Sequence, residues 1–406
     1  MTAQDTTATP AGGANTRRNV IVLAVCQALS MSGSSLVMTI SALAGKMLAE
    51  DPAWATFPMA LQFVTTMLST IPASLLMGRI GRRAGFTIGQ CFGAAGAAVS
   101  CWALFEGSFI WFTVGSTLLG VHNAFWQYYR FAAADTAGPE FRAKAISYVL
   151  AGGVIAAFLG PQLSKATFDM LAPIQFAGGY VGVIGLSTLT IILLQFIRIP
   201  RPAAPKPGAP AGRPMLEIVR QPVFLVAVWT AMVGYAVMSL VMQATPLAME
   251  FCGFGFIDTA TVIQWHVLGM FAPSFITGHL IKRIGVLNVI LIGTLFNFAT
   301  MAINLSGIEF YNFWTSLVLL GVGWNFMFIG GTTLVTEAYR PEEQSRVQAF
   351  NDFLVFGCVS VAAFSSGVLQ AKIGWAAVNM TLALPVFTVF VAVIWYRART
   401  ASVPAE

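Results

Sequence analysis

The chain has 406 residues, of which 57% are hydrophobic and only 9% are charged, and its formal net charge at pH 7 is +6. Soluble globular proteins carry roughly 25% charged residues, so this composition excludes a soluble enzyme, a disordered chain and a nucleic-acid-binding protein. The basic residues stand in short clusters between long apolar runs, which is typical of membrane topology. We therefore predict an all-α integral membrane protein that has the lipid bilayer, and no nucleic acid, as a partner.

Long apolar stretches predict the membrane-spanning helices. A helix needs about 20 mostly apolar residues to cross a bilayer. Twelve stretches meet this requirement, at residues 19–45, 54–77, 85–105, 108–134, 145–166, 174–197, 222–249, 258–281, 286–306, 311–336, 348–370 and 374–396. We predict twelve transmembrane helices, with tails at residues 1–18 and 397–406.

The basic residues also predict the orientation of the helices. Most of the 22 lysines and arginines fall in the two tails, in the middle of the chain and in the even-numbered turns, whereas Lys46, Lys165 and Lys372 fall on the opposite side. Cytoplasmic loops of membrane proteins are enriched in Lys and Arg. We therefore predict that both termini lie in the cytoplasm.

A segment rich in Pro, Ala and basic residues divides the chain near its middle. Residues 198–221 read RIPRPAAPKPGAPAGRPMLEIVRQ, which is typical of a linker that is stiffened by proline. The segment lies on the predicted cytoplasmic side. It separates an N-terminal six-helix bundle, residues 19–197, from a C-terminal six-helix bundle, residues 222–396.

The two predicted bundles resemble each other in sequence. Arg79-Ile80-Gly81 recurs as Arg283-Ile284-Gly285, and Leu118-Leu119-Gly120-Val121 recurs as Leu319-Leu320-Gly321-Val322, at nearly the same spacing. Two repeats joined by a linker predict a duplicated transporter architecture, with a binding site between the halves near the middle of the membrane.

The turn after the second predicted helix, SLLMGRIGRR, resembles the signature loop of the major facilitator superfamily, Gly-x-Leu-x-Asp-Arg-x-Gly-Arg-Arg. The matching residues are Arg79, Gly81, Arg82 and Arg83. Gly78 stands where the family has its aspartate, and Lys282 does so in the second repeat. The resemblance implies the major facilitator fold and secondary transport, without the acidic residue of the family's cytoplasmic latch.

Catalytic and nucleotide-binding motifs are absent from the sequence, so we predict that the protein is not an enzyme and holds no cofactor. The seventh predicted helix carries Met238 and Met242, and the eighth carries His266 and Met270. Each pair is spaced i, i+4 and so shares a helical face. The pairs lie at similar depths and can approach each other if both faces point between the bundles. Thioether and imidazole ligands suit Cu(I), which predicts a soft-metal site.

These Met-x-x-x-Met and His-x-x-x-Met pairs resemble those of the CcoA-like branch of the superfamily, which are bacterial copper importers. The resemblance implies that Met238, Met242, His266 and Met270 bind copper, which is the transported substrate. It also implies copper import across the bacterial inner membrane by alternating access, for delivery to a cytoplasmic copper acceptor and for cytochrome oxidase assembly. We expect a monomer.

Four further residues are auxiliary candidates. Ionisable residues inside spans are costly and are therefore functional candidates. His122 and Arg130 in the fourth predicted helix, with Asp135 at its cytoplasmic end, are candidates for proton coupling; the alternative for Arg130 is an ion pair with Asp135 or with a neighbouring helix. Cys252 lies in the outer turn after the seventh helix and is a candidate for first contact with copper. The odd number of five cysteines predicts no disulfide framework.

Other functions fit parts of the same sequence. Methionine is an adaptable filler of apolar helices, so the metal motifs have packing as their alternative. The chain would then be a proton-coupled transporter of a small organic molecule such as riboflavin or a drug, whose ring stacks on Phe125, Trp126, Tyr128 and Tyr129. A third hypothesis is an assembly factor or copper sensor in the membrane that binds metal without transporting it.

Overall fold

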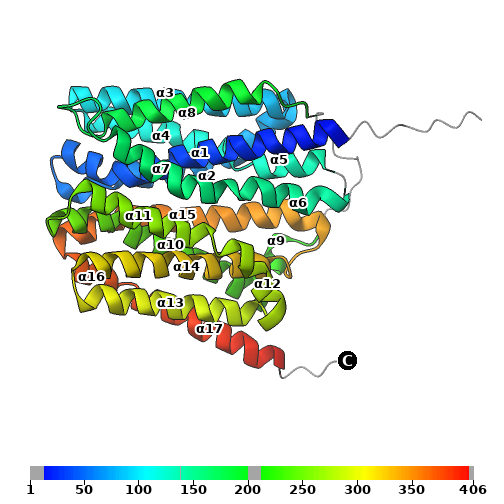
Figure 1. Ribbon diagram of the computed structural model, residues 1–406. Helices are drawn as coiled ribbons and strands as arrows, with labels where there is room; N and C mark the ends of the chain where they lie inside the picture. Colours follow the sequence, from blue (N-terminus) through cyan, green and yellow to red (C-terminus); the bar gives the residue numbers. More distant parts are fainter. Residues whose placement is uncertain (1–12, 138, 200–211, 402–406) are drawn as a thin grey trace, which may run out of the picture.

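A computed structural model describes residues 13–137, 139–199 and 212–401. Every regular element within these residues is a helix, and the helices run roughly parallel or antiparallel to one another (Figure 1). This arrangement confirms the predicted all-α fold. Residues 1–12, 200–211 and 402–406, which belong to the predicted tails and linker, lie outside the described residues.

Residues 13–194 form the helices of the N-terminal half, which lies at the top of Figure 1. They are α1 (Gly13–Leu48), the 3-10 helix η1 (Pro52–Trp54), α2 (Phe57–Ile80), α3 (Arg82–Glu106), α4 (Phe109–Trp126), α5 (Tyr129–Thr136), α6 (Pro139–Leu150), α7 (Gly152–Thr167) and α8 (Ala177–Leu194).

The C-terminal half follows a short helix, α9 (Met215–Val219), and lies at the bottom of Figure 1. Its elements are α10 (Pro222–Phe251), α11 (Phe256–Phe271), α12 (Ser274–Ile284), α13 (Val286–Ser306), α14 (Phe310–Val335), the 3-10 helix η2 (Pro341–Glu343), α15 (Gln344–Lys372), α16 (Trp375–Met380) and α17 (Ala383–Ala401).

Each of the twelve predicted spans corresponds to helical structure, but four of them, 108–134, 145–166, 258–281 and 374–396, are each divided between two helices. Ten helices in the described part of the chain are long and apolar enough to cross a membrane. The predicted span 108–134 is divided into α4 and α5, and the span 258–281 is divided into α11 and α12. In the second case Pro273 lies at the break, where its missing N–H and its ring disfavour a continuous helix.

The helices begin and end at two opposite ends of the bundle. The first residues of α1 and the last residues of α17 lie at the same end, on the right of Figure 1, which we call the terminal end. The opposite end, which we call the distal end, carries the turns that follow α1, α3, α7, α10, α13 and α15. Large apolar side chains such as Leu75, Ile110 and Phe275 are more than half exposed along the sides of the bundle, as expected for contact with lipid.

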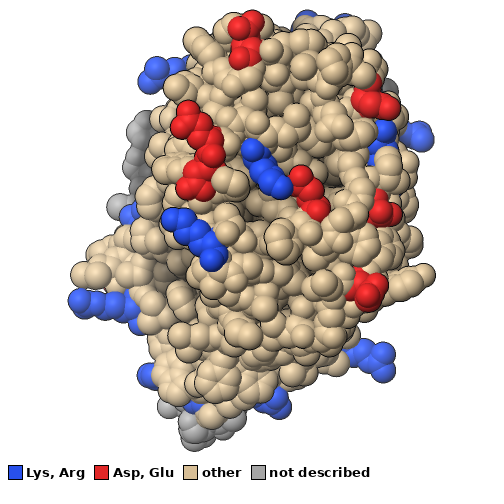
Figure 2. Space-filling model, turned by 90° about the vertical axis from the view of Figure 1, so that its left-hand side faces the viewer, with Lys and Arg blue, Asp and Glu red and all other residues tan. Residues whose placement is uncertain are grey.

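The two ends differ in charge. Acidic residues dominate the distal turns and helix ends: Glu50, Asp51, Glu106, Asp169, Glu250, Asp258 and Glu309. Figure 2 looks onto this end and shows acidic side chains around a few basic ones near its middle. Only Lys46, Lys165 and Lys372 supply positive charge among the distal residues described, whereas arginines gather at the terminal end. The cytoplasmic placement of the terminal end rests on this asymmetry and stays a prediction.

Helices within each half pack closely at glycines. A Cβ atom added to Gly96 in α3 would lie 2.8 Å from the carbonyl oxygen of Gly115 in α4, and one added to Gly323 in α14 would lie 3.1 Å from the carbonyl oxygen of Gly293 in α13. Without a hydrophobic driving force between helices in lipid, such close packing provides much of the association energy. The halves themselves meet chiefly where α2 packs on α15 and where α7 packs on α11.

Candidate functional site

Polar contacts join the two halves along α7 and α11 near the distal end. The Lys165 Nζ atom donates a hydrogen bond of 2.8 Å to Thr261 Oγ1, and one helical turn deeper Gln162 Nε2 donates a bond of 2.8 Å to Gln264 Oε1. Asp258, at the start of α11, also acts electrostatically on Lys165. In the sequence, Lys165 stands out only as one of the few lysines predicted on this side of the membrane.

An ion pair and an aromatic group lie beside these bonds. Lys46 in α1 and Glu250 in α10 form an ion pair of 3.0 Å. Phe256 in α11 lies against the Phe168 ring, stacked at 4.6 Å between centroids, and against the edge of Phe176 at 5.4 Å. Each contact joins one half to the other.

The second contact region lies between η1–α2 and α15. The hydroxyl of Thr56 accepts a hydrogen bond of 3.1 Å from the Gly367 N–H, and donates one of 3.3 Å to the Phe364 carbonyl. The ring of Trp54 packs on that of Phe364 at 5.5 Å.

We call the contacts of both regions the distal seal. It comprises the pairs Lys46–Glu250, Gln162–Gln264, Lys165–Thr261, Phe168–Phe256, Phe176–Phe256, Thr56–Gly367 and Trp54–Phe364. The two halves are thus closed against each other at the distal end.

Two opposite charges face each other between the halves nearer the terminal end. Arg130 in α5 and Asp352 in α15 interact electrostatically, although they form no direct ion pair among the described residues. The Arg130 guanidinium lies 4.8 Å from the centroid of the Phe131 ring, and its Nε atom is buried without a hydrogen-bond partner in the described part of the chain. Asp352 accepts a hydrogen bond of 3.1 Å from Asn351.

Of the two partners considered for Arg130, Asp135 is wrong, whereas a charge on a neighbouring helix, Asp352 of α15, does act on it. Asp135 forms an ion pair of 2.9 Å with Arg82, which belongs to the signature-like turn between α2 and α3. Arg82 also lies 5.9 Å from the centroid of the Tyr128 ring. The turn therefore binds α5 within the N-terminal half. The charge that acts on Arg130 is that of Asp352.

His122 is a buried residue of the N-terminal half. Its Nδ1 atom lies 3.1 Å from the Gly89 carbonyl, and the side chain is 4% exposed. A Cβ atom added to Gly93 would lie 2.8 Å from the same nitrogen, so α3 and α4 enclose the ring closely. The contacts of His122 are those of a packed residue that joins two helices of one half.

The four predicted copper ligands lie in the core of the C-terminal half. Met238, Met242 and Met270 belong to one cluster of buried apolar residues, and His266 is fully buried. The Nδ1 atom of His266 lies 2.8 Å from the Leu317 carbonyl of α14, and its Nε2 atom has no partner among the described residues.

The helix arrangement differs from the one that the metal prediction assumed. Helices α10 and α11 are consecutive in sequence, yet each packs more extensively on α14 than on the other. His266 therefore faces α14 as well as the core. Cys252 is half-buried at the end of α10, and all five cysteines are free. The assignment of these residues as metal ligands stays a prediction.

An aromatic cluster at mid-height was missed by the sequence analysis. Trp324 and Phe328 of α14 stack with centroids 5.1 Å apart and planes only 11° from parallel. Tyr235 of α10 stands at 70° to both rings, at 5.4 and 5.3 Å. Phe271 and Phe356 adjoin Trp324 and Tyr235 at 6.0 and 5.9 Å. We call these five residues the aromatic cluster. The i, i+4 spacing of Trp324 and Phe328 is its one signal in the sequence.

The aromatic cluster reaches the boundary between the halves. Tyr235 and Phe328 pack against both the C-terminal core and the apolar cluster that includes Leu36 and Ile40 of α1. A Cβ atom added to Gly153 of α7 would lie 3.0 Å from the Phe271 ring. The cluster therefore belongs to one half and contacts the other.

A polar group on α1 and α4 lies in the N-terminal half at similar height. Asn123 Oδ1 accepts hydrogen bonds from Ser34 Oγ at 3.1 Å and from Trp126 Nε1 at 2.9 Å. Ser34 is three residues from Met31, which lies beside Gly153 and Phe271, and so shares a face of α1 with it. Met31 and the Phe271 ring of the C-terminal half thus both approach α7 at Gly153.

The aromatic residues predicted in the fourth helix are divided between two environments. Phe125 and Tyr129 are 5% and 1% exposed and belong to the core of the N-terminal half, where the Tyr129 hydroxyl accepts a hydrogen bond from Gln90. Trp126 and Tyr128 are half-buried, and the Tyr128 hydroxyl donates to the Thr70 carbonyl at 3.1 Å. Only the latter two retain exposed ring surface of any extent.

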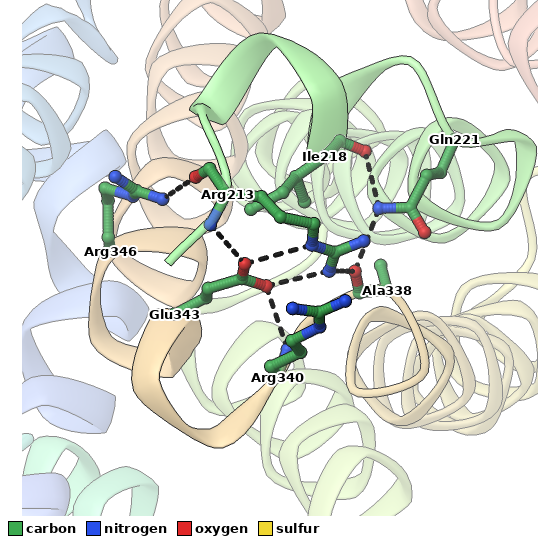
Figure 3. Close-up of polar contacts among 7 residues, drawn as sticks. All are labelled: Arg213, Ile218, Gln221, Ala338, Arg340, Glu343 and Arg346. Atoms are coloured by element: carbon green, nitrogen blue, oxygen red, sulfur yellow. Dashed lines mark hydrogen bonds and ion pairs between the residues drawn. The ribbon is translucent and has the colours of Figure 1, made fainter. Parts of the chain in front are cut away.

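A charged cluster fixes the described end of the linker to the C-terminal half (Figure 3). The Arg213 guanidinium holds Glu343 with bonds of 3.0 and 2.7 Å, and the Arg213 and Arg340 N–H groups donate to the same carboxylate. Arg346 donates to the Arg213 carbonyl, and Gln221 donates to that of Ala338. The bonds from Arg213 hold the pKa of the Glu343 carboxyl well below its usual range.

Comparisons with known proteins were made for the whole chain. The family model of the Major Facilitator Superfamily matches residues 23–355. The riboflavin transporter RfnT of Brucella anthropi is 38% identical over 96% of this chain and 98% of its own length. The uncharacterized MFS-type transporter YdeG of Bacillus subtilis is 25% identical over 94% of this chain and 93% of its own length.

Solved structures share the fold at low sequence identity. An auto-inhibited POT family peptide transporter superposes with a TM-score of 0.69 at 14% identity, covering 96% of this chain and 98% of its own. A bacterial homologue of the human lysosomal transporter Spinster superposes with a TM-score of 0.65 at 16% identity, covering 95% of this chain and 97% of its own.

These comparisons correct the prediction of copper import. The relative that is 38% identical over nearly the whole chain is a riboflavin transporter and not a copper importer. The comparisons support membership of the superfamily, but they do not support the closer resemblance to CcoA-like importers. The prediction that copper is the transported substrate is therefore wrong. The helical fold, the family match and the full-length relatives together lead to one conclusion: the chain is a multi-pass membrane transporter that belongs to the Major Facilitator Superfamily.

Proposed function

We propose that this protein is a secondary transporter that carries riboflavin across the bacterial inner membrane. The observation that carries the proposal is the 38% identity to a riboflavin transporter, which extends over 96% of this chain. Because the match covers both halves and all the spans, it includes every residue that could line a path between the halves. The same substrate is one of the small organic molecules considered from the sequence.

The arrangement of the halves supports transport by alternating access. The distal seal closes the halves at one end, through the hydrogen bonds of Gln162, Lys165 and Thr56, one ion pair and several ring contacts. No covalent link crosses it, so a rocking motion of one half against the other can break these contacts together. Riboflavin would then enter or leave between the halves at the distal end while the terminal end closes.

The charge distribution supports an orientation for this cycle. Arginines at the terminal end and acidic residues at the distal end favour a cytoplasmic terminal end and a periplasmic distal end. The described structure, with its closed distal seal, would then correspond to the state that is shut toward the periplasm. The charges of Arg130 and Asp352 lie between the halves on the cytoplasmic side, where a coupling ion would pass.

The test is exchange of riboflavin in proteoliposomes that contain the purified protein. Vesicles loaded with unlabelled riboflavin should accumulate labelled riboflavin from outside, in a saturable manner, whichever direction the protein works in cells. Empty liposomes and liposomes with the same protein crosslinked between Lys46→Cys and Glu250→Cys serve as controls. Accumulation no greater than in empty liposomes would refute riboflavin as the substrate. An imposed proton gradient in the same vesicles tests whether protons drive uptake.

A further inference from the structure

We propose that the aromatic cluster is the subsite for the flat ring system of the substrate, and that Trp324 donates a hydrogen bond to the polar edge of this ring. The inference rests on the proposed transport of riboflavin and deepens it. It assigns ring recognition to the C-terminal half, through Tyr235, Phe271, Trp324, Phe328 and Phe356, and not to the aromatic residues of α4.

The geometry of the cluster suits a flat aromatic ligand. Trp324 and Phe328 stack on each other with planes 11° from parallel, and Tyr235 stands at 70° to both. A planar ring that lies in the plane of Trp324, with its polar edge toward Nε1, would be parallel to Phe328 and would meet the Tyr235 ring edge-to-face, and both are favoured arrangements for aromatic pairs. The Phe271 ring lies 6.0 Å from that of Trp324, and the Phe356 ring lies 5.9 Å from that of Tyr235, between centroids.

The position of the cluster suits a site that both halves must reach. Tyr235 is about 20 Å along α10 from Pro222, and Trp324 is about 17 Å along α14 from Val335, at a rise of 1.5 Å per residue. Both are therefore near the middle of the bundle. Tyr235, Phe271, Phe328 and Phe356 are only partly buried at this depth, and the Phe271 ring lies beside Gly153 of α7 across the boundary.

An unsatisfied donor lies within the cluster. Trp324 is 7% exposed, and its Nε1 atom has no hydrogen-bond partner among the described residues. Buried tryptophan N–H groups usually have a partner, because leaving one unpaired costs free energy. The polar edge of a flavin ring carries carbonyl oxygens and ring nitrogens that accept hydrogen bonds. A bound ring would therefore satisfy Trp324, while an apolar ring would not.

The polar group on the N-terminal half complements the aromatic cluster. Asn123 accepts bonds from Ser34 and Trp126 with its oxygen, and its Nδ2 atom makes no hydrogen bond within the described residues. Ser34 shares a face of α1 with Met31, beside Phe271. The hydroxyl chain of the substrate would lie on this side, and so each half would hold a chemically different part of one molecule.

The test uses direct binding to purified protein, measured by the quenching of flavin fluorescence. The ligands are riboflavin, lumiflavin, which keeps the ring and lacks the hydroxyl chain, and ribitol, which is the chain without the ring. Trp324→Phe keeps an aromatic face and removes the donor, while Trp324→Leu removes both. Trp375→Phe is the matched control, because Trp375 is 8% exposed and also has an unpartnered Nε1, but packs on Phe313 at the distal end.

We expect lumiflavin to bind the wild type and to compete with riboflavin, whereas ribitol competes weakly. Trp324→Phe should weaken lumiflavin binding by about threefold and Trp324→Leu by about tenfold or more, as expected for a lost hydrogen bond and a lost ring contact. Trp375→Phe should bind like the wild type. Size-exclusion elution and a Tm equal to those of the wild type establish that each variant is folded. If Trp324→Leu misfolds, the binding of lumiflavin to Trp324→Phe alone tests the proposal.

The outcomes separate this inference from the proposed function. Riboflavin exchange by the wild type, with wild-type lumiflavin binding in both Trp324 variants, would overturn the ring subsite and leave the function intact. No riboflavin exchange, but lumiflavin binding that is lost on changing Trp324, would support the ring subsite and refute riboflavin as the substrate. Neither exchange nor lumiflavin binding would overturn both.

Discussion

Lys46 of α1 and Glu250 of α10 form an ion pair of 3.0 Å that connects the two halves at the distal end. The two side chains are 36% and 47% exposed, so water and salt screen their attraction. Exposed pairs of this kind contribute about 0–1 kcal/mol. The pair is therefore a weak closure that the transport cycle can break, and the neighbouring rings and hydrogen bonds carry more of the distal seal.

Neutralising this pair should favour opening of the distal end. We expect Lys46→Gln or Glu250→Gln to raise the open population by at most about fivefold, and by less at high salt. The measurement is the rate at which an impermeant maleimide modifies Ser34→Cys, which lies on α1 closer to the middle of the bundle than the seal, in a protein whose five native cysteines are serine. The exchange Lys46→Glu with Glu250→Lys should restore the slow rate. Lys372→Gln is the control, and an unchanged rate in both single variants would refute a closing role.

Glu343 should stabilise the C-terminal half in a pH-dependent way. Its pKa is held below the ordinary value of 4.5 by the bonds from Arg213, so its contribution is complete above that value and is lost as the pH falls below it. Glu343→Gln should lower the Tm by a few degrees at neutral pH, and should lose less stability than the wild type on acidification. Thermal unfolding in detergent between pH 7 and pH 3 measures both effects.

The neighbouring carboxylate provides the control for Glu343. Glu342 is exposed and makes no bond to Arg213 in the described structure, although its charge acts weakly on that guanidinium. Glu342→Gln should therefore leave the Tm and its dependence on pH close to those of the wild type. Equal behaviour of the two variants would mean that the cluster in Figure 3 does not hold the linker.

Gly120 should be intolerant of even one methyl group. A Cβ atom there would overlap the Gln62 carbonyl of α2, at a point where Thr66 also donates a hydrogen bond of 3.0 Å to the Gly120 carbonyl. Gly120→Ala should destabilise the N-terminal half by about 1–3 kcal/mol through overpacking. Gly78→Ala, where a Cβ atom meets nothing within 4 Å, should be neutral or slightly stabilising. The measurement is the Tm of both variants in thermal unfolding. A similar Tm for the two would show that an added methyl group at Gly120 does not overpack the contact between α2 and α4.

The fold was predictable because hydropathy sets it segment by segment. The predicted span 286–306 coincides with α13, since its ends are marked by Gly285 and Gly307. The breaks after α4 and α11 were not predicted, because each continues an apolar run that hydropathy alone reads as one helix. Pro273 was the available signal for the second break, whereas Gln127 and Tyr128 give no comparable signal for the first.

The site was less predictable because a sequence does not say which helices become neighbours. We predicted that His266 approaches the methionines of the preceding helix because the two helices are consecutive along the chain. In the structure α14 packs on both helices, and the Leu317 carbonyl of α14 is hydrogen-bonded to the His266 ring. The aromatic cluster also depends on which helices become neighbours in the fold. Trp324 and Phe328 are close in sequence, while Tyr235 and Phe356 reach them only through the packing of α10 and α15.

Arg130 and Asp352 should depend on each other across the halves. They lie about 9 and 12 Å from the terminal ends of α5 and α15, where the dielectric is low and an uncompensated charge is costly. We expect Arg130→Gln and Asp352→Asn each to reduce riboflavin exchange at least about tenfold, because each leaves one charge unbalanced between the halves. The double variant removes both charges and should recover part of the exchange, measured at equal protein in proteoliposomes.

Two controls make this prediction specific. Asp135→Asn removes the partner of Arg82 within one half, so it should affect stability but should not be rescued by Arg130→Gln. Arg130→Asp combined with Asp352→Arg reverses the two charges, and should recover exchange better than either single reversal if their attraction is what matters. Exchange that is equally low in the single and double neutral variants would show that each residue acts alone, for instance as a direct ligand of the substrate or of the coupling ion. Recovery in the double variant would instead identify the pair as an electrostatic connection that forms and loosens as the terminal end closes and opens.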